Sequence, residues 1–347
     1  MIVGTCSFGS TGSSAVTDYL HEFQGLQVLD KIEFTWVSRV DGLIDLDYHL
    51  FNTHNRTEDS VKAIARYKEL AESCIFYYKK AGKADSKAMR DSVERFLESI
   101  TQVKWYWEYE RPKDVFLKYI SALYERIIPK LEIKKGCQIN CWPMKEACLS
   151  VSPEHFEEAA KAHVRELLTA IGAEHDRMVV LDQPFAGNNP QACFKYFEEP
   201  YAIVVDRDPR DNYVFANTKL LGQNHFMAVT PVEDFVKYYR SLRKSQPYTR
   251  QDSRVLSIKF EDMVFHYDET TKKIRKFLNL GENPAPKSIF DPAISMPNTR
   301  VWLRYPQYAK DIEYIERELP EYLFDYSGCP EPDLKGEMFF GKSPKNK

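Results

Sequence analysis

The chain opens with a short apolar run that leads into a glycine- and serine-rich loop and then into a helical pattern. Residues 4–14 read GTCSFGSTGSS. Glycines let backbone N–H groups converge on one point, and the start of the following helix adds unpaired donors and the positive end of its dipole. The segment therefore predicts a strand–loop–helix unit that cradles an anion. A Gly/Ser-rich turn with a serine helix cap is the alternative. The hydroxyl donors of the loop are Ser10, Thr11, Ser13 and Ser14.

The spacing of this loop matches the nucleotide-triphosphatase pattern GxxxxGK[ST] at all but one position. Gly4 and Gly9 occupy the glycine positions, and Ser10 replaces the lysine. A P-loop kinase or nucleotide hydrolase would also need a magnesium-holding aspartate after an apolar strand, and Asp182 is the nearest residue of that kind. Such an enzyme stays an alternative, but the sequence predicts no metal site.

Apolar runs alternate with helical patterns along much of the chain. Strands are expected at residues 27–34, 177–181, 201–205 and 255–260. Helices are expected at residues 13–22, 42–51, 153–171, 190–197, 211–221, 231–244, 268–278 and 311–323. Apolar strands separated by helices are typical of an α/β fold, in which helices cover both faces of a parallel sheet.

Residues 56–149 interrupt this alternation with charged segments of helical periodicity. We expect helices at 62–80, 88–103 and 115–128. The interpretation is an inserted helical region, serving as a lid or a substrate subdomain. Its Trp105-Tyr-Trp107 run could stack on a sugar, but at helical spacing these aromatic residues are expected in the core. The resulting division is an α/β core at 1–55 and 150–325, the insertion at 56–149, and a C-terminal tail at 326–347.

Charge, cysteine content and hydropathy exclude several classes of protein. The net charge of −3 lacks the basic footprint of a nucleic-acid-binding protein. Seven cysteines without zinc-site spacing indicate free thiols in a reducing compartment. No signal peptide and no window long enough for a membrane span is visible in the sequence. Together these features predict a cytoplasmic protein with no membrane span and no nucleic-acid partner.

A second anion-binding candidate follows the apolar run at 201–205, where the sequence continues as DRDPRD. In doubly wound sheets, ligands sit beyond the carboxyl ends of the strands. Arg207 would stand at such an end, and a guanidinium suits bidentate phosphate contacts. Arg207 and the loop would then share one ligand if their strands are neighbours. A surface Arg–Asp turn is the alternative.

Three segments, taken in order, resemble the sulfotransferase superfamily. Residues 9–16 are similar to its 5′-phosphosulfate loop, and residues 204–211 are similar to its 3′-phosphate strand–helix. Residues 255–262 and 274–280 look like the strand and helix near its C-terminal third. The resemblance implies a three-layer, P-loop NTPase-like sulfotransferase fold with a helical insertion. It also implies a sulfuryl donor, 3′-phosphoadenosine 5′-phosphosulfate (PAPS), whose product is adenosine 3′,5′-bisphosphate (PAP).

The resemblance also implies roles for individual residues. The 5′-phosphosulfate would be held by Thr11, Gly12, Ser13 and Ser14. Arg207 would hold the 3′-phosphate, and Arg300 is the nearest counterpart of a basic residue that often completes that site. The acceptor would be a hydroxyl group, and a carbohydrate is the candidate by analogy with the family.

Two positions depart from the family pattern. The loop lysine that stabilises the bridging oxygen falls at Ser10, which we therefore place in both the catalytic and the donor-binding set. The serine expected eight residues after the 3′-phosphate arginine falls at Phe215. Family members often use Glu or His soon after the second strand as the general base, and Glu33 is our candidate. Other candidates for the base are His49, His54 and His225. A catalytically inactive protein that binds PAP or another nucleotide is the remaining alternative.

Overall fold

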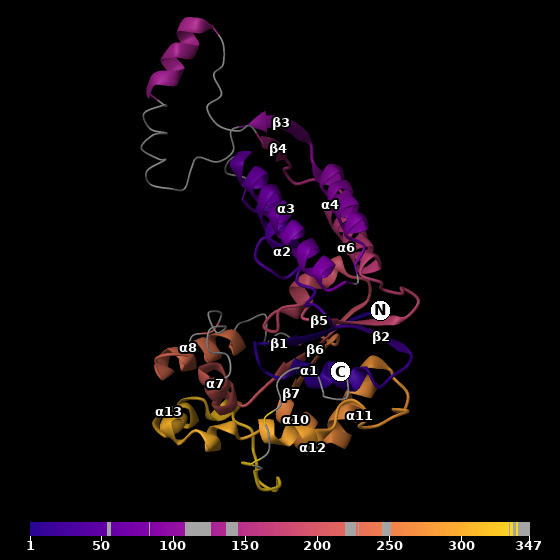
Figure 1. The fold of residues 1–347 in the computed structure, drawn as a ribbon, viewed down its shortest axis with the longest axis vertical. Coiled ribbons are helices and arrows are strands. Elements are labelled where there is room, and N and C mark those ends of the chain that lie inside the picture. Colours follow the sequence, from indigo (N-terminus) through magenta and orange to yellow (C-terminus); the bar gives the residue numbers. More distant parts are fainter. Residues whose placement is uncertain are drawn as a thin grey trace.

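A parallel sheet of five strands, in the order β2-β5-β1-β6-β7, forms the centre of the molecule in the computed structural model (Figure 1). The strands are β1 (Ile2–Ser7), β2 (Leu26–Leu29), β5 (Met178–Asp182), β6 (Pro200–Asp206) and β7 (Val255–Lys259). The predicted α/β fold with a parallel sheet is thus confirmed. The structure describes residues 1–53, 57–82, 84–107, 126–136, 145–218, 227, 229–244, 251–332, 334, 335 and 338.

Side chains on the central strands alternate between two hydrophobic clusters, one on each face of the sheet. On β1, Ile2 and Cys6 join one cluster, whereas Val3 joins the other. On β6, Val204 and Val205 divide in the same way. Successive strand residues point to opposite faces, so an unbroken apolar run fills both. The sheet is therefore the middle layer of three.

Helices cover each face and one end of this sheet (Figure 1). The first face carries α2 (Leu43–Phe51), α3 (Thr57–Lys80), α4 (Ser86–Ile100) and α6 (Phe156–Ala170). The second face carries α1 (Ser13–Leu20), α10 (Phe260–Phe265), α11 (Tyr267–Leu278) and α12 (Pro292–Ser295). A third cluster joins α7 (Pro209–Thr218), α8 (Val232–Arg243) and α13 (Ala309–Glu318). Short 3-10 helices are η1 (Pro190–Tyr196), η2 (Met296–Asn298), η3 (Val301–Arg304), η4 (Pro306–Tyr308) and η5 (Pro320–Tyr322).

The segment between β2 and β5 extends away from the sheet, and a small antiparallel pair lies at the far ends of α3 and α4 (Figure 1). This pair consists of β3 (Val103–Trp107) and β4 (Lys145–Leu149). The helix expected to reach residue 103 ends at Ile100, and the aromatic run belongs to β3. Tyr106 is 70% exposed, so its predicted place in the core is wrong. The helix expected at 115–128 lies largely outside the described residues, although residues 126–135 are helical. The proposed domain limits stay predictions.

Two expected element boundaries are also wrong. The strand expected at 27–34 ends at Leu29, because the chain then turns inward and the Phe34 N–H donates to the Asp182 carbonyl at 2.8 Å. The helix expected from residue 153 begins at Phe156, after the left-handed residue His155. Ser152 instead donates its N–H to the Leu50 carbonyl at the end of α2. In both places a tertiary contact decides the boundary.

Among the helices in the described part of the chain, none combines the length and the apolar content that crossing a membrane would require.

Candidate functional site

The carboxyl ends of the parallel strands meet at one edge of the sheet, and polar residues end the three central strands. Ser7 ends β1, Asp182 ends β5 and Asp206 ends β6. Because β1 lies between β5 and β6, the loop after β1 adjoins the segments that follow both neighbours. Ligands bind at this kind of edge in α/β proteins.

The loop after β1 is held in a conformation that requires glycine. Gly9, Ser10 and Gly12 have φ values of 88°, 54° and 93°. A Cβ atom at Gly12 would lie 2.6 Å from the Phe260 ring, so both the backbone angle and the packing demand glycine there. Ser10 adopts a left-handed conformation that residues other than glycine rarely accept. The loop is therefore a specifically built turn.

The Thr11 hydroxyl fixes this loop to the sheet. Thr11 is fully buried. Its Oγ1 donates to the Val205 carbonyl at 2.6 Å and accepts from the Phe8 N–H at 3.2 Å. The side chain predicted to bind phosphosulfate is thus engaged inside the protein, which leaves only its backbone N–H for a ligand.

The backbone of the loop offers unused donors. For the N–H groups of residues 10–14, no hydrogen bond to an acceptor in the described ranges is found. Two of them belong to Ser13 and Ser14, the first residues of α1, where helical N–H groups have no partner of their own. Ser14 is also exposed. Converging free amides at a helix start form a cradle for an anion.

The structure brings the second predicted segment beside this loop. The Asn212 side chain, on α7, donates to the Gly9 carbonyl at 3.1 Å. The Phe260 ring lies against Gly12, and its centre is 4.9 Å from the Arg207 guanidinium carbon. The loop and Arg207 therefore contact the same aromatic side chain.

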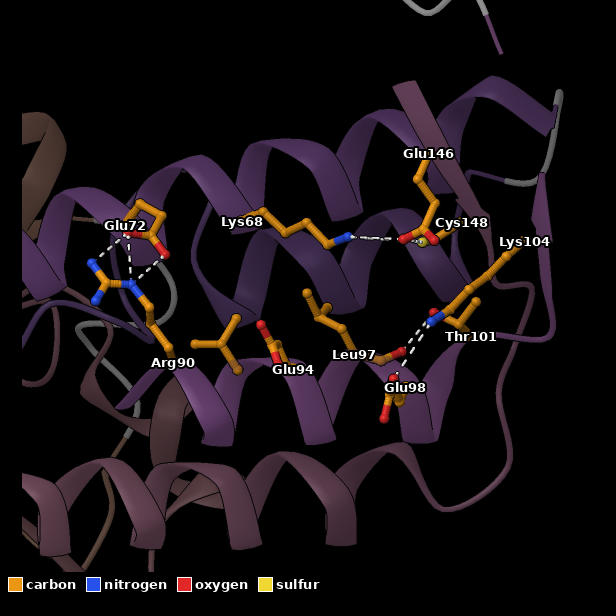
Figure 2. Close-up of a pocket in the computed structure, with 11 residues that line it drawn as sticks. Lys68, Glu72, Arg90, Glu94, Leu97, Glu98, Thr101, Lys104, Glu146 and Cys148 are labelled. Carbon is orange, nitrogen blue, oxygen red and sulfur yellow. Dashed lines mark hydrogen bonds and ion pairs between the residues drawn. The ribbon is translucent and has the colours of Figure 1, made fainter. Parts of the chain in front are cut away.

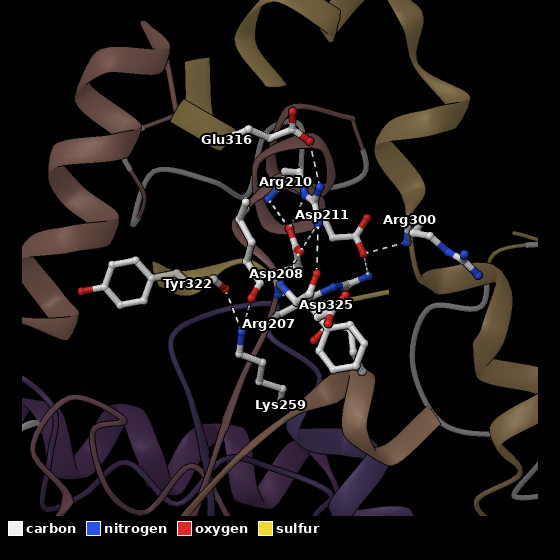
Figure 3. Close-up of polar contacts among 12 residues, drawn as sticks. Arg207, Asp208, Arg210, Asp211, Lys259, Arg300, Glu316, Tyr322 and Asp325 are labelled. Atoms are coloured by element: carbon white, nitrogen blue, oxygen red, sulfur yellow. Dashed lines mark hydrogen bonds and ion pairs between the residues drawn. The ribbon is translucent and has the colours of Figure 1, made fainter. Parts of the chain in front are cut away.

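Arg207 is buried in a cluster of charged residues (Figure 3). Its guanidinium donates to the Asn298 carbonyl and lies 3.7 Å from Asp211. The Phe215 ring stacks on it at 4.2 Å from the guanidinium carbon to the ring centre. The Nε atom is buried without a hydrogen-bond partner among the described residues. Phe215, which stands where a serine was expected, thus packs against the guanidinium instead of donating a hydroxyl.

Three fully buried carboxyl groups surround Arg207. Asp208 accepts from the Arg210 guanidinium at 2.7 Å, and its own N–H donates to Glu261 at 3.0 Å. Burial raises the pKa of Asp211 to about 7, against the opposing effect of Arg207. Burial and the neighbouring Asp208 likewise raise the pKa of Glu261. A carboxyl group loses hydration on burial, which disfavours its charged form.

Arg300 joins the same cluster through its backbone. The Arg300 N–H donates to Asp211 at 2.9 Å, and the residue is left-handed, with φ 51°. Its guanidinium donates to the Pro330 carbonyl at 2.5 Å and lies 5.0 Å from the centre of the Tyr326 ring. The two arginines predicted to bind phosphate thus both contact the Asp211 carboxylate. Each guanidinium already donates a hydrogen bond to a backbone carbonyl of the protein.

No contact of Glu33 with the loop or with Arg207 is found among the described residues, although its neighbour Phe34 donates an N–H to Asp182 at the end of β5. Glu33 is exposed and follows β2, the edge strand that β5 separates from β1. Its expected position at the end of a strand is therefore wrong, because β2 has already ended at Leu29. Among the other candidate bases, His49 lies on α2, with its Nε2 atom 3.8 Å from Oδ1 of Asp45 on the same helix. His54 and His225 lie outside the described residues.

Gln183 lies beside the loop after β1, and the sequence did not identify it as a candidate. It follows β5 in a left-handed conformation, with φ 52°. Its side-chain Nε2 lies 2.9 Å from both Ser7 Oγ and Ser13 Oγ, and its Oε1 accepts the Ser7 N–H at 3.1 Å. The only sequence signal was a polar residue two positions after the apolar run at 177–181.

One hollow lies beside the loop, and another lies between the helices of the segment that joins β2 and β5. A small cleft of about 60 Å³ borders the loop, lined by residues that include Ser14, Asp18, Phe260, Asp291 and Asn298. A groove of about 420 Å³ lies between α3 and α4 in the inserted region (Figure 2). Charged side chains line this groove and pair with one another, as Arg90 does with Glu72 at 3.1 Å. No residue of the loop lines the groove.

The chain is structurally similar to two sulfotransferase domains. That of the curacin biosynthetic pathway is 12% identical, with a TM-score of 0.33 over 82% of this chain and 74% of that chain. That of the Synechococcus PCC 7002 olefin synthase is 12% identical, with a TM-score of 0.36 over 91% of this chain and 92% of that chain. At this identity and TM-score, neither likeness decides the activity. No protein-family model and no curated protein matches the chain.

Proposed function

We propose that this protein is a cytoplasmic sulfotransferase-like enzyme that moves a sulfuryl group from PAPS to an acceptor hydroxyl. One observation carries the proposal: a loop with five unused backbone donors lies beside a buried arginine, and Phe260 touches both. Two anion-binding elements at neighbouring strand ends suit a ligand with two phosphate-type groups.

The loop would bind the 5′-phosphosulfate mainly through its backbone. Sulfuryl transfer resembles phosphoryl transfer, in which positioning and stabilisation of charge on peripheral oxygens supply most of the catalysis. The N–H groups of Thr11, Gly12, Ser13 and Ser14 and the start of α1 would supply that stabilisation. Ser10 would add a hydroxyl near the position where a lysine was expected.

Arg207 and Arg300 would hold the 3′-phosphate. The unpartnered Nε atom of Arg207 supports this assignment, because a buried donor without a partner is costly. The phosphate would have to displace the Asn298 and Pro330 carbonyls that the two arginines now contact. A phosphate is a stronger hydrogen-bond acceptor than these neutral carbonyls, which would favour the exchange.

Glu33 is our proposed general base, and its test is direct. A positioned base contributes about 10²–10⁴-fold to a rate. Glu33→Gln should lower turnover by that factor while PAP binding, measured by calorimetry, stays unchanged. Equal losses of turnover and of PAP binding would contradict this role. The acceptor is proposed to be a hydroxyl of a carbohydrate, which the inserted region would help to position.

Calorimetry tests the function itself. The protein should bind PAP without a metal ion and should bind ATP with magnesium weakly. It should then transfer labelled sulfate from PAPS to a hydroxyl acceptor in a carbohydrate panel. Tighter binding of magnesium ATP would favour a P-loop kinase or hydrolase. Binding of PAP without transfer to any acceptor would identify a catalytically inactive binding protein.

A further inference from the structure

We propose that Gln183 is a positioning residue that turns the hydroxyl hydrogens of Ser7 and Ser13 toward an anion in the loop. This inference rests on the proposed function for the identity of the anion, but its geometry is independent of that identity. Gln183 follows β5, 176 residues away from Ser7 in sequence, and its side chain joins that strand end to the loop.

The backbone fixes the orientation of the Gln183 amide. The oxygen and nitrogen of a glutamine side chain are assigned from their hydrogen-bond partners. Here the Ser7 N–H, which can only donate, lies 3.1 Å from one end of the amide. That end must be the oxygen. The opposite end, which contacts both serine hydroxyls at 2.9 Å, must be the NH₂ group.

This orientation determines what the serine hydroxyls can do. An amide NH₂ has two hydrogens and no acceptor, so Ser7 Oγ and Ser13 Oγ both accept from Gln183. Ser7 Oγ also lies 3.4 Å from the Gly9 N–H, which is a second donor. Each hydroxyl therefore keeps its own hydrogen for another group. Within the described ranges, no acceptor for either hydrogen is found.

The position of these hydrogens suggests their target. Ser7 and Ser13 bracket the loop whose five backbone amides are also unused. A group that accepts from all of these donors has to be an oxyanion, such as a phosphate or sulfate group. The left-handed φ of 52° at Gln183 fits this role, because strain of this kind is kept where the surrounding structure needs a particular side-chain direction.

Gln183→Glu is the sharpest test, because it keeps the size and one acceptor oxygen for the Ser7 N–H. The second oxygen would accept from the serine hydroxyls and so turn their hydrogens away from the loop. PAP should bind about 10-fold to 100-fold more weakly, the range for hydrogen bonds to a charged group. Adenosine 3′-monophosphate, which lacks the 5′ group, should keep its wild-type affinity.

A second variant separates positioning from simple support of the fold. In a Ser13→Ala background, Gln183→Glu should weaken PAP binding by a smaller factor, since one of the hydroxyls is already gone. Gln27→Met is the matched control. Gln27 also bridges backbone groups, with 2.8 Å to the Gly172 carbonyl and 2.7 Å to the Glu174 N–H, but it lies outside the loop. This control should leave PAP binding unchanged.

The outcomes distinguish this inference from the proposed function. If the wild-type protein does not bind PAP, the sulfotransferase proposal fails, and pyrophosphate becomes the probe for Gln183. Weaker binding of pyrophosphate by Gln183→Glu would then still support the inference. Equal affinities of variant and wild type for PAP or for pyrophosphate would overturn it. Equal weakening of both adenosine phosphates, or a wild-type protein that binds neither PAP nor pyrophosphate, would overturn it as well.

Discussion

The loop after β1 and the arginine cluster after β6 lie side by side, yet they handle charge in opposite ways. The loop contains no charged side chain, and its backbone donors are unused. The cluster is built from charged side chains that contact one another, as the 2.7 Å pair of Arg210 and Asp208 shows. An anion can enter the loop without breaking a protein contact, whereas at Arg207 it must compete with one.

The difference shows that charge in a sequence is a poor guide to binding capacity. A buried guanidinium needs partners, because the cost of removing it from water is several kcal/mol. Arg207 finds them in Asp211 and the Asn298 carbonyl. The neutral loop has no such need, so its donors stay available. We infer that the loop supplies most of the anion affinity and that the cluster has a larger role in the fold.

The largest expected effect follows from removing the charge of Arg207. Arg207→Met should destabilise the protein by about 3–5 kcal/mol in urea unfolding, because buried carboxylates lose their cation. Arg90→Met is the control. Arg90 pairs with Glu72 at an exposed site, where an ion pair contributes about 0–1 kcal/mol. If Arg207→Met were about as stable as the wild type, the charged cluster around Arg207 would not be needed to stabilise the fold.

Local patterns in the sequence predicted much of the fold. The apolar runs at 177–181, 201–205 and 255–260 each match a strand to within one residue. These runs are unbroken because both faces of the sheet are covered, which makes them easy to detect. The glycine loop was equally clear because its glycine spacing is a local pattern, although its contacts with Val205 and Phe260 were not visible in it.

Tertiary contacts account for what the sequence missed. The inward turn at Phe34 and the place of Tyr106 on a strand depend on partners far along the chain. The role of Gln183 was missed because it depends on hydrogen bonds to Ser7 and Ser13. A single sequence does not show that these residues are neighbours. The pairing of both predicted arginines with protein carbonyls was equally invisible, because composition does not show which acceptors the fold supplies.

A substitution at Gly12 tests whether the loop conformation is as specific as its geometry indicates. Gly12→Ala should cost about 2–4 kcal/mol of stability, since it combines left-handed strain with a contact 2.6 Å from Phe260. Gly172→Ala is a matched control, because Gly172 has the same φ of 93° and open space around it. Equal losses in the two variants would mean that packing against Phe260 adds nothing.

Within the loop, Thr11 and Ser14 should behave differently. Thr11→Val removes a buried hydroxyl that bonds to Val205 and Phe8, and it should cost about 2 kcal/mol of stability. Ser14→Ala removes an exposed hydroxyl and should leave the stability unchanged while weakening PAP binding. Thermal unfolding and calorimetry on the two variants measure both effects. The reverse pattern would show that Thr11, rather than Ser14, presents its hydroxyl to the ligand.

The smallest expected effect is a dependence of stability on pH, which should come from the cluster and not from the loop. The pKa of Asp211 is raised from 3.8 to about 7 in the folded protein. Between these values the folded protein keeps a proton that the unfolded chain has released, so stability should fall as the pH rises toward 7. We expect this fall between pH 5 and pH 8 in urea unfolding, and Glu261, whose pKa burial also raises, should contribute to it.

Asp211→Asn should reduce this pH dependence and leave the part that Glu261 contributes, whatever its effect on the absolute stability. Asp325→Asn is the control, because Asp325 is exposed and its pKa is lowered by its contacts with Ser327. A lowered pKa affects stability only in more acidic solution, so this variant should keep the wild-type slope between pH 5 and pH 8. If Asp211→Asn also keeps that slope, Asp211 keeps one protonation state between pH 5 and pH 8. If that state is the ionised one, Arg207 is fully paired within the protein, and the loop alone would have to supply the affinity for an anion.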